Sequence, residues 1–291
     1  MVHTSPSNRS LHAFTLVELA IVLVVIGLII GAILTQRDLT RSAEVRGQIS
    51  QLERMTAAFN TFRTKYNAIP GDASNATQLF DTNEWPDVRN GNGNRQIEVL
   101  TSTASNGLAP ATGTATYRSV TEIASPDHIG EVLQFWHQLT AAELIDGQYN
   151  GKGGAGGAAT ENGRAGYAFP SARMGGGVGV FSEGARIYLQ IGVLDGVSYR
   201  TAPAIQPIQA YNIDAKMDDG SPTTGGVTLR NGQQNAVINT PISAADVNAG
   251  GGSTNACIED NITPLNNSNL RTATYGFSNE NVACSLRIRV N

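Results

Sequence analysis

The sequence predicts an α+β fold in which one long N-terminal helix packs on an antiparallel sheet with loop insertions. Three observations support this prediction. An almost unbroken apolar run at residues 14–34 continues into an amphipathic helical pattern that reaches Tyr66. Alternation of apolar and polar residues within 186–193 and 284–290 indicates strands. Stretches rich in glycine, asparagine and threonine lie between these elements, which is typical of loops.

Composition excludes some classes of protein. The chain has 291 residues, of which 41% are hydrophobic and 15% charged, so it is long enough and apolar enough to bury a core. The formal net charge is -4, and no basic patch with interleaved aromatic residues occurs. Nucleic-acid binding needs clustered lysine and arginine, so we expect no nucleic-acid partner.

The apolar run, FTLVELAIVLVVIGLIIGAIL at residues 14–34, is long enough to cross a membrane. At about 1.5 Å per residue, a helix of this length spans the roughly 30 Å of hydrocarbon in a bilayer. Residues 1–13 carry Arg9 and no acid, which predicts a cytoplasmic N-terminus and a body on the far side of the membrane. An ordinary secretory signal is the alternative, but its apolar core is usually only about 7–15 residues long.

The helical pattern continues after the apolar run. Residues 36–66 place apolar side chains at three- and four-residue steps, and no proline occurs before Pro70. These positions are Leu39, Ala43, Val45, Ile49, Leu52, Met55, Phe59, Phe62 and Tyr66. We therefore expect a continuous helix from Phe14 to Tyr66, roughly 80 Å long, with Gly47 as its one weak point.

The block AFTLVELAIVLVVIGLIIGAI, which begins at Ala13, resembles the N-terminus of type IV pilins and type II secretion pseudopilins. The residues that match the pattern of this family are Phe14, Thr15, Leu16, Glu18 and Leu19. Ala13 stands where the family has Gly, and Thr35 stands where type IVa pilins have Pro. The resemblance implies a pilin-like fold, cleavage by the prepilin peptidase between Ala13 and Phe14, and N-methylation of Phe14. It divides the chain into a leader at 1–13, a helix at 14–66 with a transmembrane or filament-core segment at 14–34, and a globular head at 67–291.

The resemblance also implies a function. The chain would be a single-pass inner-membrane protein, cytoplasmic at its N-terminus, until the inner-membrane pilus or secretion machinery assembles it into a filament. That filament would be a type IV pilus or a type II secretion pseudopilus, periplasmic or at the cell surface, made of this chain alone or mixed with other pilins. The alternative is a minor or tip pilin whose head binds a surface or secreted cargo. No motif of an enzyme active site occurs, so we expect no catalytic activity.

Glu18 is the one ionisable residue in the apolar run. A carboxylate in hydrocarbon costs several kcal/mol or more unless it is paired. After cleavage, the amine of Phe14 in the same or a neighbouring chain would be that partner, which gives Glu18 a role in assembly. Gly27 and Gly31 form a GxxxG pattern that allows close approach of helices. The alternative is a Glu tolerated near the interface of a plain membrane anchor.

Two motifs in the first part of the head are open to interpretation. The segment Asn90–Asn94 resembles a calcium loop with amides in place of acids, and the sequence favours turn chemistry there. Ser125 and Pro126 form a helix start, and the apolar face that follows predicts a helix that Gly147 ends. That face consists of Ile129, Val132, Leu133, Trp136, Leu139 and Leu144. We expect His137 on this helix to be a surface or core residue and not part of a site.

The two cysteines, Cys257 and Cys284, lie close to the C-terminus. If the body is exported, a disulfide between them is the natural interpretation, and two free thiols are the alternative. Residues 284–290 alternate cleanly, and we expect them to form a C-terminal edge strand that the disulfide attaches to the head.

An acidic group follows a predicted helix at Pro203–Met217, where Ile205, Ile208, Tyr211 and Met217 have helical spacing. Three acids, Asp214, Asp218 and Asp219, are concentrated near a glycine turn and are candidates for a Ca²⁺ site. Lys216 lies among them and would neutralise part of their charge. The sequence favours a helix-ending acidic turn, and we expect no cofactor, with Ca²⁺ as the alternative. The stretch YNIDAKMDDGSPTTGGV also resembles a recurring segment of larger pilin-like proteins.

Overall fold

The computed structural model describes residues 15–97, 130–152, 164–183, 185–195, 200–231, 236–237, 257–259 and 274–290. Two compact units make up the chain. The N-terminal unit is Met1–Glu44 and the C-terminal unit is Val45–Asn291. Together the described residues form an α+β protein with an antiparallel sheet, as the sequence predicts.

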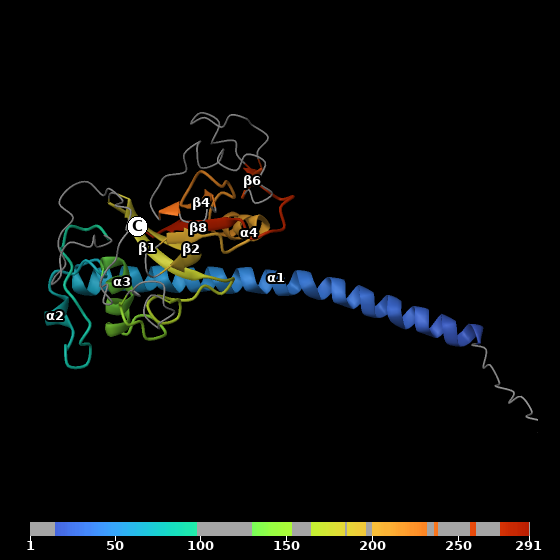
Figure 1. Ribbon diagram of the computed structural model, residues 1–291, viewed down its shortest axis with the longest axis horizontal. Helices are drawn as coiled ribbons and strands as arrows, with labels where there is room; N and C mark the ends of the chain where they lie inside the picture. The colour runs from blue at the N-terminus through green and yellow to red at the C-terminus, as the bar shows by residue number, and fades with distance from the viewer. Residues whose placement is uncertain are drawn as a thin grey trace, which may run out of the picture. The chain divides into compact units, whose positions relative to one another are not determined.

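The first helix, α1, covers Leu16–Tyr66 and passes through Gly47 without a break (Figure 1). It therefore confirms the expectation of a continuous helix to Tyr66. Asn67 follows with a φ of 51°, a left-handed conformation that Asn adopts more readily than most residues and that ends the helix. Arg63 and Lys65 lie in the last turn, where positive charges interact favourably with the helix dipole.

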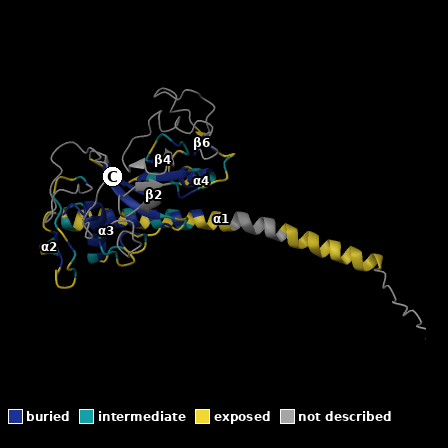
Figure 2. Cartoon of the chain, in the orientation of Figure 1, coloured by how far each residue is buried: buried dark blue, intermediate teal, exposed yellow. Residues whose placement is uncertain are grey.

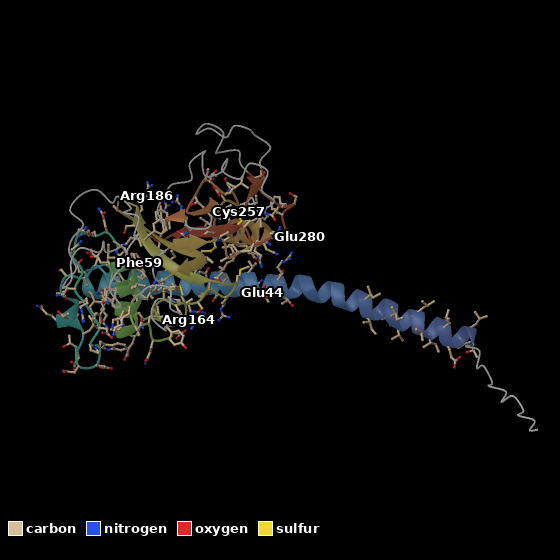
Figure 3. All side chains as sticks on the ribbon, viewed as in Figure 1. Glu44, Phe59, Arg164, Arg186, Cys257 and Glu280 are labelled. Carbon is tan, nitrogen blue, oxygen red and sulfur yellow. A yellow bond between two sulfur atoms is a disulfide. The ribbon has the colours of Figure 1, made fainter. Side chains whose placement is uncertain are left out.

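In the C-terminal unit, α1 buries a single stripe of side chains in the core (Figure 2). The buried members lie along one stripe and are Val45, Gln48, Leu52, Met55, Ala58, Phe59 and Phe62. The ring of Phe59 (Figure 3) stacks on that of Phe135 with 6.1 Å between centroids. The predicted stripe is confirmed from Val45 to Phe62, whereas Ala43 is exposed and Leu39 lies outside the described side chains.

The strands form two antiparallel sheets. The larger sheet has six strands in the order β4-β8-β2-β3-β5, and β1 pairs with β2. Its members are β1 (Gly177–Glu183), β2 (Arg186–Asp195), β3 (Arg200–Ala202), β4 (Val227–Asn231), β5 (Ala236–Val237) and β8 (Cys284–Arg289). The smaller sheet pairs β6 (Ile258–Glu259) with β7 (Thr274–Tyr275). The β1–β2 pair is a hairpin in which Glu183 faces Arg186.

The C-terminal strand β8 is not an edge strand, and this prediction from the sequence is wrong. It lies between β2 and β4, where Ile288 is opposite both Leu189 and Val227. Both of its faces are covered in the first half, because Ser285 is buried as well as Leu286. The alternation of residues indicates which face of a strand is apolar, but it carries no information about the number of neighbouring strands.

Helix α3, Glu131–Ala141, is buried on all sides over residues 131–140. The predicted start at Ser125 and Pro126 lies outside the described residues. The helix ends at Ala141, before the predicted end at Gly147, because the N–H groups of Glu143 and Leu144 turn back to the carbonyls of Thr140 and Leu139. Glu143 has a φ of 58°, a position that usually belongs to glycine, so the sequence contains no clear signal for this end.

Two glutamines on α3 use both ends of their amides to bind backbone groups of a preceding loop. Gln134 accepts the N–H of Arg89 at 2.9 Å and donates to the carbonyl of Asp87 at 2.9 Å. Gln138, one turn further on, accepts the N–H of Gly71 at 2.7 Å and donates to the carbonyl of Arg89 at 2.9 Å. These four backbone groups, which lie in an irregular loop, thereby find hydrogen-bond partners.

Two carboxylates hold the asparagine-rich segment that follows. Glu131 accepts the N–H of Asn92 at 3.1 Å, and Asp72 accepts the N–H groups of Gly93 at 2.6 Å and Arg95 at 2.7 Å. N–H donors surround the Asp72 carboxylate, so its surroundings are those of a bound anion and unlike those of a cation ligand. The structure therefore favours turn chemistry over a calcium loop for this segment.

The remaining helices are short. Helix α2 covers Ala76–Leu79, and α4 covers Pro207–Met217, with a reciprocal capping box between Gln206 and Gln209. Helical spacing from Pro203 suggests an earlier start for α4. The N–H groups of residues 204 and 205 instead donate to the carbonyl of Cys284, at 2.9 and 3.2 Å, which holds that segment beside β8.

Cys257 and Cys284 form a disulfide, with 5.1 Å between their Cα atoms, which confirms the expected pairing (Figure 3). The bond joins the residue before β6 to the first residue of β8. With a sequence separation of 27, it contributes about 3–4 kcal/mol in the chain-entropy account of cross-links.

The glutamine contacts of α3 lead to a test of stability. Gln138→Leu removes the partners of the buried Gly71 N–H and the partly buried Arg89 carbonyl, so we expect the free energy of unfolding to fall by about 2–4 kcal/mol. Chemical denaturation of the full chain in detergent measures the change. Gln78→Leu, at an exposed position of α2, is the matched control and should leave the midpoint nearly unchanged. Equal midpoints for the two variants would contradict this account.

Candidate functional site

The N-terminal unit exposes a large apolar surface. Every described side chain from Thr15 to Gly31 is exposed, and the large apolar residues have between 46% and 88% of their surface accessible. They are Leu16, Val17, Leu19, Ile21, Val22, Leu23, Val24, Val25, Ile26, Leu28, Ile29 and Ile30. Exposed apolar surfaces of this size commonly mark sites of contact with a protein or a membrane.

Glu18 has a defined local role at the start of α1. The Thr15 N–H and hydroxyl both donate to Glu18 Oε2 at 2.8 Å, and the Glu18 N–H faces Thr15 Oγ1 at 3.3 Å. This reciprocal pattern is a capping box, which satisfies two backbone N–H groups that the first turn leaves without helical partners. The T-x-x-E spacing signals the box, so Glu18 has a local role in addition to the one predicted in assembly.

The structure places the other predicted residues of the N-terminal unit only in part. Ala13 and Phe14, the expected cleavage and methylation residues, lie outside the described residues. At Gly27 and Gly31, an added Cβ would meet no atom within 4 Å, so both glycines lie on open surface. Among the residues that the structure describes, no helix has both the length and the apolar character needed to cross a membrane.

The acidic group lies where α4 ends and turns towards β4. Asp214 is fully buried in the last turn of α4, whereas Asp218 and Asp219 are exposed just after it. One carboxylate oxygen from each lies within 4.8 Å of the others. Asp218 is the C-cap of α4, and its N–H donates to the Asp214 carbonyl at 2.6 Å. The three acids therefore lie in the turn that ends α4.

Hydrogen bonds orient the three carboxylates. Oδ2 of Asp218 accepts the N–H groups of Gly226 and Val227 at 2.5 and 3.1 Å. Oδ2 of Asp219 accepts the hydroxyl of Thr224 at 2.5 Å. These contacts hold the turn that connects α4 to β4 in one conformation.

Asp214 is bound differently from the other two acids. Its Oδ2 accepts the hydroxyl of Tyr275, from β7, at 2.6 Å, and its Oδ1 is buried without a hydrogen-bond partner. Tyr275 is 61 residues away along the chain, and nothing in the sequence indicates the contact. Sequence reasoning therefore identified the three acids but missed the tyrosine.

The electrostatics follow from this arrangement. Burial raises the pKa of Asp214 to about 6, and the nearby Asp219 and Asp218 act in the same direction. The Tyr275 hydroxyl and the Gly220 N–H favour the charged carboxylate and oppose the rise. Burial and the Asp214 contact raise the pKa of Tyr275. Lys216 is exposed, and none of the described Lys and Arg residues forms an ion pair with the three acids.

His137 is a buried residue of α3. Its Nδ1 lies 2.5 Å from the carbonyl of Tyr149, so Nδ1 carries the proton of the neutral ring, and the buried Nε2 has no partner. Trp85 contacts the imidazole edge to face. Burial lowers the pKa of His137, because a proton on Nε2 would have no acceptor, and the Tyr149 carbonyl only partly opposes this. The contacts fit the expectation of a core histidine.

Comparison of the chain with models of protein families, with curated proteins and with solved structures finds no match. The functional interpretation therefore depends on the chain's own residues.

The pKa of His137 leads to a prediction for acid stability. The unfolded chain takes up a proton near pH 6.5, but the folded chain resists it, so stability should fall as pH drops below about 6.5. Asp214 acts in the opposite sense, since its raised pKa favours the folded chain at low pH and this contribution is lost as pH rises through about 6.

His137→Asn separates the two contributions, because Asn retains a donor for the Tyr149 carbonyl and does not titrate. Unfolding free energies of the full chain in detergent should be measured from pH 7.5 to 5. We expect wild type to lose more stability than the variant over this range. Parallel curves would show that His137 does not govern the acid response.

Proposed function

We propose that this chain is a pilin-type structural subunit, which polymerises through its N-terminal helix after a leader at 1–13 is removed. The observation that carries the proposal is the block AFTLVELAIVLVVIGLIIGAI, whose residues from Leu16 onward lie in α1 with one acid in its first turn. The proposal includes a single-pass inner-membrane form with 14–34 in the bilayer, followed by a type IV pilus or a type II secretion pseudopilus. It assigns no catalytic role to the chain.

The exposed apolar surface of α1 supports polymerisation on energetic grounds. Full burial of a large apolar side chain contributes about 1.5–3 kcal/mol, so twelve such residues contribute on the order of 20–30 kcal/mol before entropy costs. Burial of one unpaired carboxylate costs several kcal/mol. Apolar packing therefore outweighs the cost of Glu18, and pairing of Glu18 serves to select the position of each neighbour.

The capping box refines the role of Glu18. Both Thr15 hydrogen bonds go to Oε2, and no other described residue is bound to Oε1. After cleavage, the positive amine of Phe14 would lie directly before the cap. Within one subunit the box would hold the carboxylate in place, and the amine of a neighbouring subunit would approach Oε1. Such pairing between chains would set the stagger of subunits along the filament.

The N-terminal peptide tests the pathway. Mass spectrometry of the protein from its native membrane or sheared filaments should find a peptide that begins with methylated Phe14. A peptide that begins at Met1, or after residue 34, would mean a retained anchor or an ordinary signal and would end the filament proposal. The amount in sheared filaments separates a major subunit from the alternative, a minor or tip subunit whose head binds a surface or secreted cargo.

Three substitutions separate the charge of Glu18 from its capping role. Glu18→Gln keeps the capping box but removes the charge, and Glu18→Val removes both. Thr15→Val keeps the charge and the backbone N–H bond to Glu18 but loses the threonine hydroxyl of the box. We expect both Glu18 variants to insert normally into the membrane. Their amount in filaments should fall at least about tenfold, which corresponds to a loss of about 1.4 kcal/mol in the free energy of assembly. Thr15→Val should be affected less.

Quantification of each variant in membrane and sheared-filament fractions measures the effect. Glu44→Gln, an exposed acid on the same helix, is the control and should assemble like wild type. Normal assembly of Glu18→Gln would show that the carboxylate acts only as a cap and would remove the pairing mechanism.

A further inference from the structure

We infer that His137 is a pH-sensitive latch, which holds the segment 149–152 on α3 at neutral pH and releases it when the imidazole takes up a second proton. The release is local. It frees this segment and the ion pair beside it, while the rest of the C-terminal unit stays folded. Neither step depends on filament assembly.

The segment lies directly on the imidazole. His137 Nδ1 lies 2.5 Å from the carbonyl of Tyr149. Gly151, at a φ of +65°, is so close to α3 that a Cβ there would lie 2.9 Å from the His137 Cβ and 2.8 Å from Gln134 Nε2. The chain can therefore cross α3 at this point only with a residue that has no side chain and tolerates a left-handed conformation.

A second loop contacts the same ring. Trp85 packs edge to face on the imidazole of His137, with 5.7 Å between the ring centroids. Asp87, two residues later, pairs with Lys152 at 2.9 Å, and both side chains are partly exposed. The ion pair that joins the two loops therefore lies beside His137, and both of its charges act on the imidazole.

The closed segment has no place for a second imidazole proton. Nε2 of His137 is buried and has no hydrogen-bond partner among the described residues, whereas protonation turns it into a donor. The charged groups that face the ring are Asp87, Arg89 and Lys152, so two cations oppose one anion. Tyr149 stays neutral, because burial raises the pKa of its phenol. An imidazolium is therefore accommodated only after the segment has moved away and water has reached Nε2.

The backbone contacts of the segment with other elements are few. In the described part of the chain, the Asn150 N–H donates to the Tyr167 carbonyl at 2.8 Å. The Tyr149 N–H lies 3.4 Å from Thr140 Oγ1, at the outer limit of a hydrogen bond. The contact of the Tyr149 carbonyl with His137 is thus one of the main attachments of the segment to α3.

The other contacts of α3 do not titrate. Gln134 and Gln138 hold the loop around Arg89 through uncharged amides. The ring of Phe135 stacks on that of Phe59. Protonation of His137 leaves these contacts unchanged, so we expect α3 to stay in the core while the segment opens.

Hydrogen exchange of the full chain in detergent, measured by mass spectrometry at pH 7.5 and 5.5, tests the latch. After correction for the direct effect of pH on exchange, we expect the protection of the amides of 149–152 to fall about tenfold at pH 5.5. The reason is that each pH unit below about 6.5, the value of an exposed His, favours the open form about tenfold. Peptides from 45–66 and 284–290 should keep their protection.

Two variants separate the titration from the packing. His137→Asn keeps a donor for the Tyr149 carbonyl but does not titrate, so its segment should exchange equally at both pH values. Gly151→Ala should displace the segment from α3 and give rapid exchange already at pH 7.5. Gln148→Ala, at an exposed position next to the segment, is the control and should respond to pH as wild type does.

Equal protection of the wild-type segment at the two pH values would overturn the latch, as would an acid response that His137→Asn retains. Slow exchange in Gly151→Ala at pH 7.5 would show that the segment does not depend on its contact with α3. An equal loss of protection in 45–66 would mean global unfolding in place of local release. None of these results bears on filament assembly, so the two proposals are tested separately.

Discussion

Complete burial of α3 is the constraint on which the rest of the C-terminal unit depends. Half of its buried residues are polar, and each must find a partner away from water: Glu131, Gln134, His137, Gln138 and Thr140. Loop backbone supplies most of these partners, since Gln134 and Gln138 hold the segment around Arg89. An apolar contact, the stacking of Phe135 on Phe59, holds α3 against α1. One helix therefore orders an irregular loop and the core together.

Two carboxylates in the chain share an electrostatic problem that the monomer does not fully solve. Glu18 lies among exposed apolar residues of α1, and its partners within the chain are both on Thr15. Asp214 is buried with one oxygen unpartnered, and its own neighbours include two further acids. For Glu18, an amine from a neighbouring subunit would supply the opposite charge in the proposed filament.

Local sequence patterns predicted where the helices and strands lie better than they predicted which elements surround them. The three- and four-residue steps to Tyr66 correctly predicted the course and end of α1, and the capping box at Thr15 could have been recognised as well. The end of α3 could not be predicted, because Glu143 occupies a left-handed position without the usual glycine. The neighbours of β8 were also hidden, because residue alternation specifies a face and not a place in the sheet.

The sequence by itself determined which segments are apolar, how long the first helix is, and which acids and cysteines occur near one another in the chain. These features depend on spacing along the backbone, which a reader of the sequence can measure directly. Only the tertiary structure decided that Tyr275 reaches Asp214 and that Gln134 and Gln138 are buried. Those contacts join residues far apart in the chain, so they depend on how the whole core closes and on which polar groups it must then satisfy.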